Sequence, residues 1–309
     1  MRLIFMGTPQ FAVPTLRLLL KSGHEVVGVV TKPDRPKGRG RHVSPPPVKI
    51  EAVKHGLPVL QPADLKDSKF LTDLKNFRAE CFVVVAFVIL PPEVFKMPPR
   101  GTVNLHASLL PKYRGAAPIQ WAIINGEKET GLTTFYIEEK VDTGKILFQE
   151  RVKIGKEETA GQLHDRLAEI GAGLLLKTLD AIEEGRARPI QQRGIPTRAP
   201  KIEKDDCRID WNMSCEKVVN LIRGLSPTPG AFTDWEGKRL KIIRARAVDV
   251  RERLSEVPGS VVEISDEGIA VAAGKGVVLI TELQLQGRKR LGVREFLLGQ
   301  KIDPGTRFD

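Results

Sequence analysis

The chain has 309 residues, of which 41% are hydrophobic and 28% are charged, and its formal net charge is +11. This composition is ordinary for a globular protein of about two domains. No apolar run approaches the roughly 18 residues that a membrane span requires. The three cysteines form no C-x-x-C pair, which argues against a disulfide framework and against a zinc site. We therefore expect a cytoplasmic protein that uses no metal and does not enter a membrane.

The first residues predict a βαβ unit. A buried strand at 2–6 ends at Gly7, a helical pattern follows, and residues 25–31 form a second strand. Strand, helix and strand within about 30 residues imply a parallel sheet. A continuous apolar run predicts a buried strand at 81–86, and the next strand is expected at 101–106. Alternation predicts a strand at 131–136, and spaced apolar residues predict a long helix at 159–185. The expected fold is a doubly wound, mostly parallel α/β domain over residues 1–185.

Two short segments carry most of the net charge. Residues 32–54 hold seven Lys and Arg against two acids, and residues 186–204 hold six against one, so each has a net charge of +5 (7 − 2 and 6 − 1). Proline and glycine are frequent in residues 32–47, where we expect a long loop with neither helix nor strand. Residues 186–204 are predicted to be a linker. Charge concentrated in loops suggests a polyanionic partner, with nucleic acid first.

The pattern changes again after the linker. A short helix is expected at 215–222, followed by several short strands that turn residues separate. Strands of this length and spacing are typical of a small β-barrel or sandwich. The expected strands are 231–235, 240–248, 259–264, 268–272 and 276–285.

Asn104 and His106 stand at the end of the predicted strand 101–106. Ligands of an open parallel sheet bind beyond the carboxyl ends of its strands, and alternation along a strand directs both side chains to the same face. Asp142 follows the strand 131–136. An amide, an imidazole and a carboxylate can stabilise an oxyanion and move a proton. On these residues alone, a structural histidine and a plain turn at Asp142 remain the alternatives.

The stretch Asn104–Gly115, N-L-H-A-S-L-L-P-K-Y-R-G, resembles the pattern N-x-H-x-S-L-L-P-x-[YW]-R-G of folate-dependent formyltransferases. Asp142-Thr143-Gly144 resembles the D-T-G of the same family, and Phe5-Met6-Gly7-Thr8-Pro9 is similar to its first strand and turn. Ile209-Asp210-Trp211 and 222–231 resemble the second domain of the members that act on charged tRNA. The resemblance therefore covers nearly the whole chain, and it implies that the second domain is a barrel of the oligonucleotide-binding (OB) type.

The resemblance implies transfer of the formyl group of 10-formyltetrahydrofolate to an amine. Asn104 and His106 would stabilise the oxyanion, Asp142 would aid proton transfer, and no metal would take part. The S-L-L-P stretch and the loop after the strand 81–86 would bind the folate. That loop is one residue shorter than the A-Y-G-x-I-L-P of the family and lacks its glycine. The expected folate-binding residues are Ser108, Leu109, Leu110, Pro111, Phe87, Val88 and Ile89.

Three interpretations of the acceptor compete. The chain could formylate initiator methionyl-tRNA for translation initiation, formylate a small amine such as an amino sugar nucleotide or a glycinamide ribonucleotide, or bind RNA without catalysis. The second domain and the two basic segments favour the tRNA. We expect a catalytic domain at 1–185, a basic linker at 186–204 and a tRNA-binding domain at 205–309, in a monomer. The residues expected to contact tRNA are Lys37, Arg39, Arg41, Arg193 and Arg198.

Overall fold

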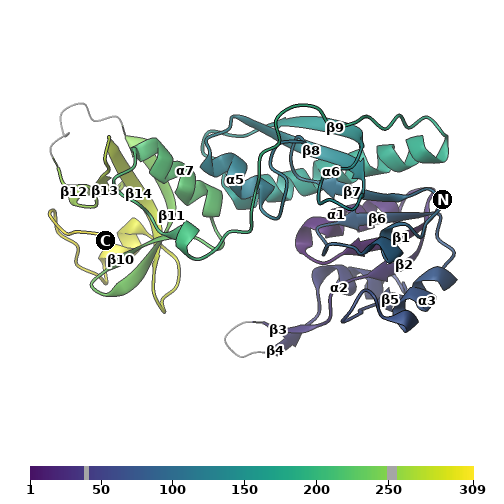
Figure 1. The fold of residues 1–309 in the computed structure, drawn as a ribbon. Helices are drawn as coiled ribbons and strands as arrows, with labels where there is room; N and C mark the ends of the chain where they lie inside the picture. Colours follow the sequence, from purple (N-terminus) through teal and green to yellow (C-terminus); the bar gives the residue numbers. More distant parts are fainter. Residues whose placement is uncertain (38–41, 249–255) are drawn as a thin grey trace. The chain divides into compact units, whose positions relative to one another are not determined.

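The protein divides into two compact units in a computed structural model that describes residues 1–37, 42–248 and 256–309 (Figure 1). The first unit comprises residues 1–115, 130–152 and 164–199, and the second comprises 116–129, 153–163 and 200–309. No single cut in the sequence separates the two units. Helix α5 (Pro118–Ile124), for example, packs against helix α7 (Cys215–Leu225) of the second unit.

A seven-stranded sheet in the order β5-β2-β1-β6-β7-β8-β9 forms the centre of the first unit (Figure 1). The pairings from β5 to β7 are parallel, and β8 is antiparallel to β7. The order runs outward from β1 in both directions, which confirms the predicted doubly wound, mostly parallel sheet. The strands are β1 (Arg2–Gly7), β2 (Glu25–Val30), β5 (Val59–Leu60), β6 (Cys81–Val85), β7 (Thr102–His106), β8 (Glu129–Tyr136) and β9 (Ile146–Lys153).

The central strands of this sheet are apolar throughout because parallel strands between helices are buried on both faces. Every residue of β6 is buried, and Leu3 to Met6 of β1 have no exposed surface. At the start of helix α3 (Ser68–Asn76) the carboxylate of Asp67 accepts a hydrogen bond from the Phe70 N–H at 2.8 Å, as expected of an N-terminal cap. The helical segments are η1 (Gln10–Ala12), α1 (Val13–Leu19), α2 (Pro47–Lys54), α3 (Ser68–Asn76), α4 (Pro92–Phe95) and α6 (Ala160–Glu183).

The basic loop at 32–47 was expected to contain no strand, and this prediction is wrong. Strands β3 (Arg35–Lys37) and β4 (His42–Ser44) form an antiparallel pair in which Pro36 lies opposite Val43. Proline is tolerated here because both strands of a two-stranded ribbon are edge strands, so its missing N–H can face away from the partner. Arg39 and Arg41, which come between these strands in the sequence, lie outside the described residues.

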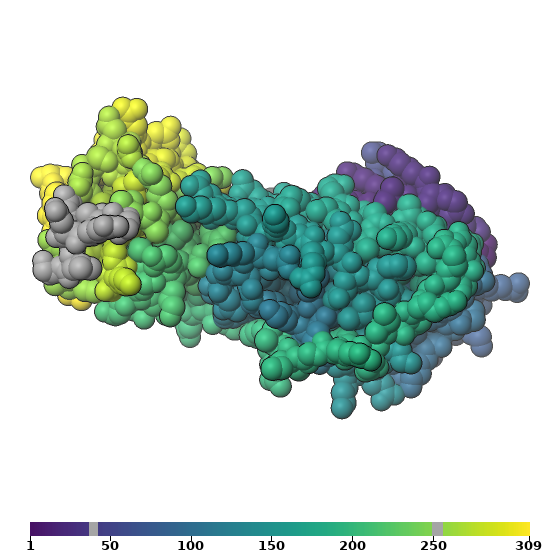
Figure 2. Space-filling view, turned by 90° about the horizontal axis from the view of Figure 1, so that it is seen from above, coloured from purple at the N-terminus to yellow at the C-terminus, as the bar shows by residue number. Residues whose placement is uncertain are grey.

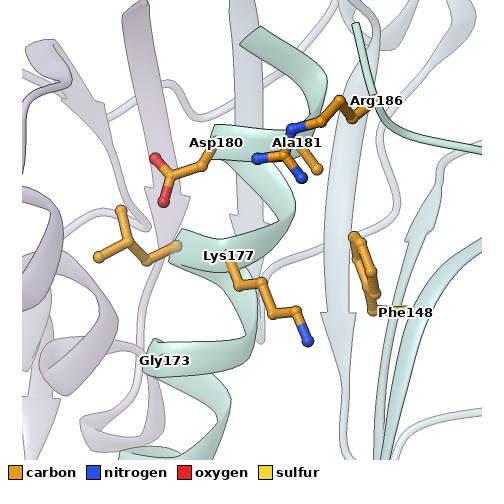
Figure 3. Close-up of a pocket in the computed structure, with 7 residues that line it drawn as sticks. Phe148, Gly173, Lys177, Asp180, Ala181 and Arg186 are labelled. Carbon is orange, nitrogen blue, oxygen red and sulfur yellow. The ribbon is translucent and has the colours of Figure 1, made fainter. Parts of the chain in front are cut away.

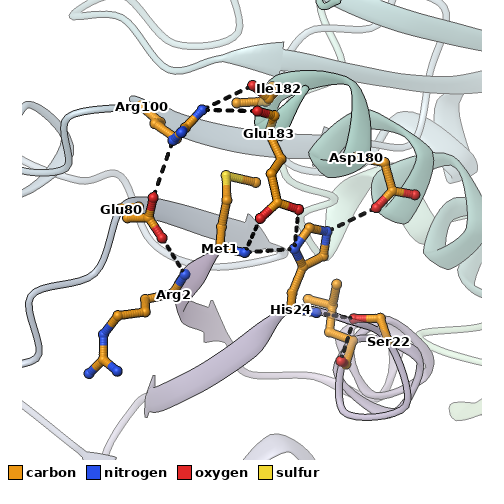
Figure 4. A network of polar contacts seen from close by, with 10 residues as sticks. Met1, Arg2, Ser22, His24, Glu80, Arg100, Asp180, Ile182 and Glu183 are labelled. Carbon is orange, nitrogen blue, oxygen red and sulfur yellow. Dashed lines mark hydrogen bonds and ion pairs between the residues drawn. The ribbon is translucent and has the colours of Figure 1, made fainter. Parts of the chain in front are cut away.

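A polar network fixes the C-terminal end of α6 within the first unit (Figure 4). The carboxylate of Glu183 pairs with the α-amino group of Met1 at 2.5 Å, and Arg100 donates to the Glu183 carbonyl at 3.4 Å. His24 lies beside Met1 and contacts Asp180 through Nε2 at 3.1 Å. The hydrogen bond from the amino group holds the pKa of Glu183 below its usual range. The basic segment that follows α6 therefore begins at a fixed point.

An antiparallel sheet forms the second unit. Its strands run in the order β10-β11-β14-β13-β12, with β15 paired to β14. The predicted second domain of short β-strands is confirmed, although the pairings within the described ranges form an open path and do not close the expected barrel. The elements are η2 (Asp205–Cys207), α7, β10 (Ala231–Trp235), β11 (Lys238–Val248), β12 (Val261–Ser265), β13 (Gly268–Ala272), β14 (Val277–Leu285), β15 (Leu291–Gly292) and α8 (Val293–Leu297).

The three cysteines are buried free thiols, and burial raises the pKa of Cys81 to about 12. Among residues 1–37, 42–248 and 256–309, no cluster of His, Cys, Asp or Glu has the size needed to hold a metal ion. No helix in these same ranges combines the length and the apolar character needed to cross a bilayer.

Candidate active site

Strands β1, β6 and β7 end together at one edge of the sheet of the first unit. Gly7 pairs with Val85, and Val85 pairs with Leu105. The winding direction of the sheet changes between β1 and β6, and ligands of such sheets bind at this switch point. A Cβ atom on Gly7 would lie 2.9 Å from the Cβ of Ala12, so the first turn passes too closely for a side chain. This edge is therefore the expected ligand site.

Strand β7 carries Asn104 and His106 to this edge. Asn104 lies between Val84 of β6 and Phe135 of β8, and His106 lies opposite Thr133. Two residues apart on one strand, the two side chains share a face of the sheet. Asn104 is half-buried, and its side chain has no hydrogen-bond partner within the described part of the chain. Its amide group is therefore available to a ligand.

His106 has a defined orientation. Its Nε2 lies 2.8 Å from the carbonyl oxygen of Tyr113, and because a carbonyl oxygen only accepts, Nε2 carries a proton. Its Nδ1 faces Oδ2 of Asp142 at 3.8 Å, which is longer than a hydrogen bond. The two side chains are 8% and 10% exposed. Nδ1 is therefore the nitrogen that remains for a substrate, and it becomes a donor when the ring is protonated.

Asp142 lies in the loop between β8 and β9 and has a left-handed backbone, with a φ of +54°. Aspartate adopts this conformation more readily than most residues, because its short polar side chain can hydrogen-bond locally. Oδ2 of Asp142 accepts a hydrogen bond from the Gly115 N–H at 2.8 Å. A Cβ atom on Gly144 would lie 1.7 Å from the Tyr136 carbonyl oxygen, so only glycine fits there. The loop therefore folds closely against β8 and brings its aspartate to His106.

The loop after β7 is closed by its own polar groups. Ser108 is fully buried, and its hydroxyl donates to the Lys112 carbonyl at 2.6 Å. The Thr133 hydroxyl donates to the Ser108 carbonyl at 2.6 Å and accepts from the N–H of Leu110 at 3.1 Å and from Nε2 of Gln149 at 2.9 Å. The Ser108 hydroxyl is thus committed to the shape of the loop.

The other residues expected to bind folate differ in exposure. Leu110 is buried, Leu109, Pro111, Phe87 and Val88 are half-buried, and Ile89 is 74% exposed. Phe87 packs against the hydrophobic core cluster that contains Ile4 and Met6. The shortened loop turns at Ala86, whose φ is +48°. The left-handed turn is therefore made without the glycine of the family pattern.

The predicted linker is attached to this site over residues 190–199. Ile190 pairs with Ile146 at the start of β9, and Arg198 pairs with Arg114 in the loop after β7. Most of this segment is exposed, and it runs along the surface of the first unit (Figure 2). Its Gln192 side chain contacts the loop that carries Asp142, and its Thr197 side chain contacts the loop after β7. The sequence did not predict these contacts, because a polar residue in an aperiodic segment has no local signal.

The residues expected to contact tRNA are partly described. Lys37 ends β3, and its backbone pairs with that of His42. Arg193 and Arg198 are exposed, and their guanidinium groups have no hydrogen-bond or ion-pair partner among residues 1–37, 42–248 and 256–309. Arg39 and Arg41 belong to the residues that the structure does not describe. Arg193 and Arg198 are therefore available to a polyanion.

A shallow groove of about 450 Å³ on the first unit shares no residue with the predicted set of Asn104, His106 and Asp142 (Figure 3). The ammonium group of Lys177 lies 5.2 Å from the centre of the Phe148 ring, which forms one wall. Asp180 contacts His24, and Arg186 pairs with Glu184. The charged groups of the groove therefore have partners within the chain.

Comparison with known proteins agrees with this geometry. Residues 1–179 match the formyl transferase family, and residues 201–301 match the formyl transferase C-terminal domain. The methionyl-tRNA formyltransferase of Alkaliphilus oremlandii (strain OhILAs) is 47% identical over 308 residues, which are 99% of each chain. That of Moorella thermoacetica (strain ATCC 39073 / JCM 9320) is 49% identical over 307 residues, which are 99% of this chain and 98% of the relative.

The fold also recurs among solved structures. HypX from Aquifex aeolicus, solved in complex with tetrahydrofolic acid, superimposes with a TM-score of 0.65 at 20% identity, over 99% of this chain and 50% of that chain. The two domain matches follow one another along the chain and together cover most of it, and the relatives match along nearly their entire length. The chain therefore belongs to the methionyl-tRNA formyltransferase family.

Proposed function

We propose that the chain transfers the formyl group of 10-formyltetrahydrofolate to the amino group of initiator methionyl-tRNA. The observation that carries this proposal is the enclosed set of Asn104, His106 and Asp142 at the end of β7, with the Asn104 amide and His106 Nδ1 open to a substrate. The acceptor follows from the near-complete match to relatives named methionyl-tRNA formyltransferase. A small amine as acceptor has no comparable support.

Asn104 and His106 act on the formyl oxygen. Attack of an amine on the formyl carbon places negative charge on that oxygen, and donors that already face it stabilise the transition state. The Asn104 amide donates from one position, and Nδ1 of His106 donates from the other when it carries a proton. Loss of one such donor typically lowers the rate by ~10²–10³. The limited exposure of His106, at 8%, strengthens the effect because little water competes for the donor.

Asp142 acts on the protons. The attacking nitrogen loses a proton and the folate nitrogen that leaves gains one. Oδ2 of Asp142 is held by the Gly115 N–H, so the carboxylate has a set orientation while keeping further acceptor capacity. It can accept the amine proton directly or through one water molecule. The attack is direct, because the Ser108 hydroxyl already donates to the Lys112 carbonyl and is not a nucleophile here.

The folate contacts come from the two loops beside this edge. Leu109, Pro111, Val88 and Ile89 offer partly or largely exposed apolar surface to the pterin. Phe87 contributes through its exposed fraction, and the buried Ser108 and Leu110 shape the loop from inside. Apolar walls with a few polar groups are typical of such sites.

The tRNA contacts come from the basic segments and the second unit. Lys37, Arg39 and Arg41 in the first segment and Arg193 and Arg198 in the second neutralise phosphates, which position a nucleic acid without reading its sequence. In this proposal residues 1–185 form the catalytic domain, residues 186–204 the basic linker and residues 205–309 the tRNA-binding domain. The enzyme works as a cytoplasmic monomer.

A comparative transfer assay tests this function. The purified chain is given 10-formyltetrahydrofolate with charged initiator tRNA, with free methionine, or with an amino sugar nucleotide. We expect formylation of the charged tRNA alone. Formylation of a small amine with none on the tRNA would refute the proposed acceptor, and activity that survives His106→Ala would refute the proposed site.

A further inference from the structure

We propose that Gln192 and Thr197 are positioning residues that hold Asp142 and His106 in their reactive geometry. Both belong to residues 190–199, which we call the strap. The proposal rests on the proposed function, because it assumes that Asp142 and His106 carry out the transfer. It gives the basic segment a role inside the active site, in addition to any contact with RNA.

Gln192 uses its whole amide group on the loop that carries Asp142. Its Nε2 donates to the carbonyl oxygens of Asp142 and Gly144, both at 2.9 Å. Its Oε1 accepts from Nη2 of Arg114 at 2.6 Å, which links this loop to the loop after β7. Both amide protons and the amide oxygen are therefore engaged, and Asp142 is held from its backbone while Gly115 holds its carboxylate.

Thr197 acts on His106 through one residue. The Thr197 hydroxyl accepts from the Tyr113 N–H at 2.8 Å, and the Thr197 carbonyl accepts from the Arg114 N–H at 2.9 Å. The carbonyl of the same Tyr113 accepts the Nε2 proton of His106 at 2.8 Å. Tyr113 therefore stands between the strap and the histidine, and its backbone position sets the direction of the imidazole ring.

The two contacts fall on two residues with left-handed backbones. Tyr113 has a φ of +58° and Asp142 a φ of +54°, a region that is unfavourable for tyrosine and that aspartate tolerates better. The hydrogen bonds from the strap stabilise both conformations. Without the strap, both residues would populate other conformations, and His106 and Asp142 would lose their alignment.

The strap also accounts for the glycine that ends the loop after β7. Gly115 has a φ of +123°, and a Cβ atom on it would lie 2.5 Å from the carbonyl oxygen of Ala199. The Ala199 N–H donates to the Arg114 carbonyl at 2.7 Å. A glycine is thus required at position 115, where the strap crosses the chain. The N–H of this same Gly115 binds the Asp142 carboxylate.

A kinetic split between adjacent residues tests the proposal. In formyl transfer from 10-formyltetrahydrofolate to initiator methionyl-tRNA, we expect Gln192→Ala to lower kcat roughly 10- to 100-fold, because small misplacements of catalytic groups have effects of this size. Its KM for tRNA should stay near the wild-type value. Arg193→Ala should do the reverse, raising KM while kcat is unchanged. Ile195→Ala, at a side chain that is 85% exposed, is the matched control and should change neither.

A second pair of variants separates positioning from folding. Thr197→Val keeps the shape and removes the hydroxyl, and it should lower kcat about tenfold. Thr197→Ser keeps the hydroxyl, so its kcat should stay close to the wild-type value. Thermal unfolding of each variant shows whether it is folded. If Gln192→Ala is not folded, the kcat values of Thr197→Val and Thr197→Ser alone test the positioning role.

The outcomes distinguish this inference from the proposed function. If the wild type formylates charged tRNA and His106→Ala does not, while Gln192→Ala and Thr197→Val keep the wild-type kcat, only the positioning role is overturned. Equal losses in Thr197→Ser and Thr197→Val would also overturn it. A wild type that does not formylate methionyl-tRNA would overturn the proposed function, and the positioning role with it.

Discussion

The two basic segments have the same net charge and different relations to the catalytic residues. In residues 32–54, β3 pairs with β4 and α2 follows; Glu51 of α2 pairs with Arg17 of α1, and Gln61 donates to the Asp34 carboxylate. Within the described residues, these attachments do not involve the catalytic set. Residues 190–199 instead hydrogen-bond to the loops that hold Asp142 and His106. Charge indicates which partner a segment can attract, and it does not show what the segment holds in place.

The two attachments also differ in kind. Glu51 is nearly buried, and its carboxylate pairs with Nη2 of Arg17 at 2.7 Å and with Nε2 of His55 at 3.2 Å. The strap is held by hydrogen bonds to backbone groups and by the neutral amide of Gln192. We therefore expect acid to loosen the first segment well before it changes the contacts of Gln192 and Thr197.

The largest expected effect is the loss of kcat on replacing His106, and the effects of the other variants are compared with it. His106→Ala should lower kcat by about 10²–10³, because it removes a donor to the developing oxyanion. Single-turnover formyl transfer with saturating folate measures the chemical step. Weaker folate binding with a normal rate would show that His106 is structural, and the strap would then have no catalytic geometry to support.

The next effect concerns stability. Pairing with Arg17 lowers the pKa of Glu51 to about 2, so the pair stabilises the fold above the ordinary carboxyl pKa of about 4.5, and this contribution is lost as the pH falls toward 2. Glu51→Gln should lower the free energy of unfolding by about 1–2 kcal/mol at pH 7, a value discounted because Arg17 is half-exposed, and by little near pH 2. Thermal unfolding at both pH values measures the difference.

The activity of the same variant sharpens the contrast between the segments. At a temperature where Glu51→Gln is folded, its kcat should equal the wild-type value, since the segment that it loosens does not hold the catalytic residues. A fall in kcat as large as that of Gln192→Ala would remove the distinction between the two segments.

The smallest effect is the one that the segments should share. Replacing Arg39 and Arg41 by Ala, or Arg193 and Arg198 by Ala, should raise KM for tRNA severalfold and leave kcat unchanged. Each lost phosphate contact should also reduce the slope of log KM against log salt concentration by about 0.7–0.9. An unchanged KM for either double variant would show that the two arginines it lacks do not contact the tRNA.

Much of the α/β fold follows from local pattern. Continuous apolar runs placed β1, β2 and β6, because parallel strands are buried on both faces and their sequences show it. The hairpin at 35–44 did not follow, since its prolines and glycines argue for a loop and the pairing is made by backbone groups at free edges. Strand β9 also escaped the pattern, because it alternates poorly, with exposed Gln149, Glu150 and Arg151 in succession.

The residues of the proposed site also divide into those that local sequence patterns could place and those that they could not. Asn104 and His106 could be placed from their position at a strand end, and Asp142 from its motif. Gln192 and Thr197 could not, because their partners Asp142 and Tyr113 are 50 and 84 residues away in the sequence. Glutamine and threonine are common in surface segments, and the geometry that gives these two a role exists only after the chain has folded.

The crossing of Ala199 over Gly115 has a consequence for how the chain can be cut. A fragment that stops at Gly185, where α6 and its turn are complete, would keep every residue of the proposed catalytic set. It would lose the ten residues 190–199 that tie the loops of that set together. For expression of shortened versions, or for joining the first domain to a different second domain, the natural place to join is after Ala199, where the first unit itself ends.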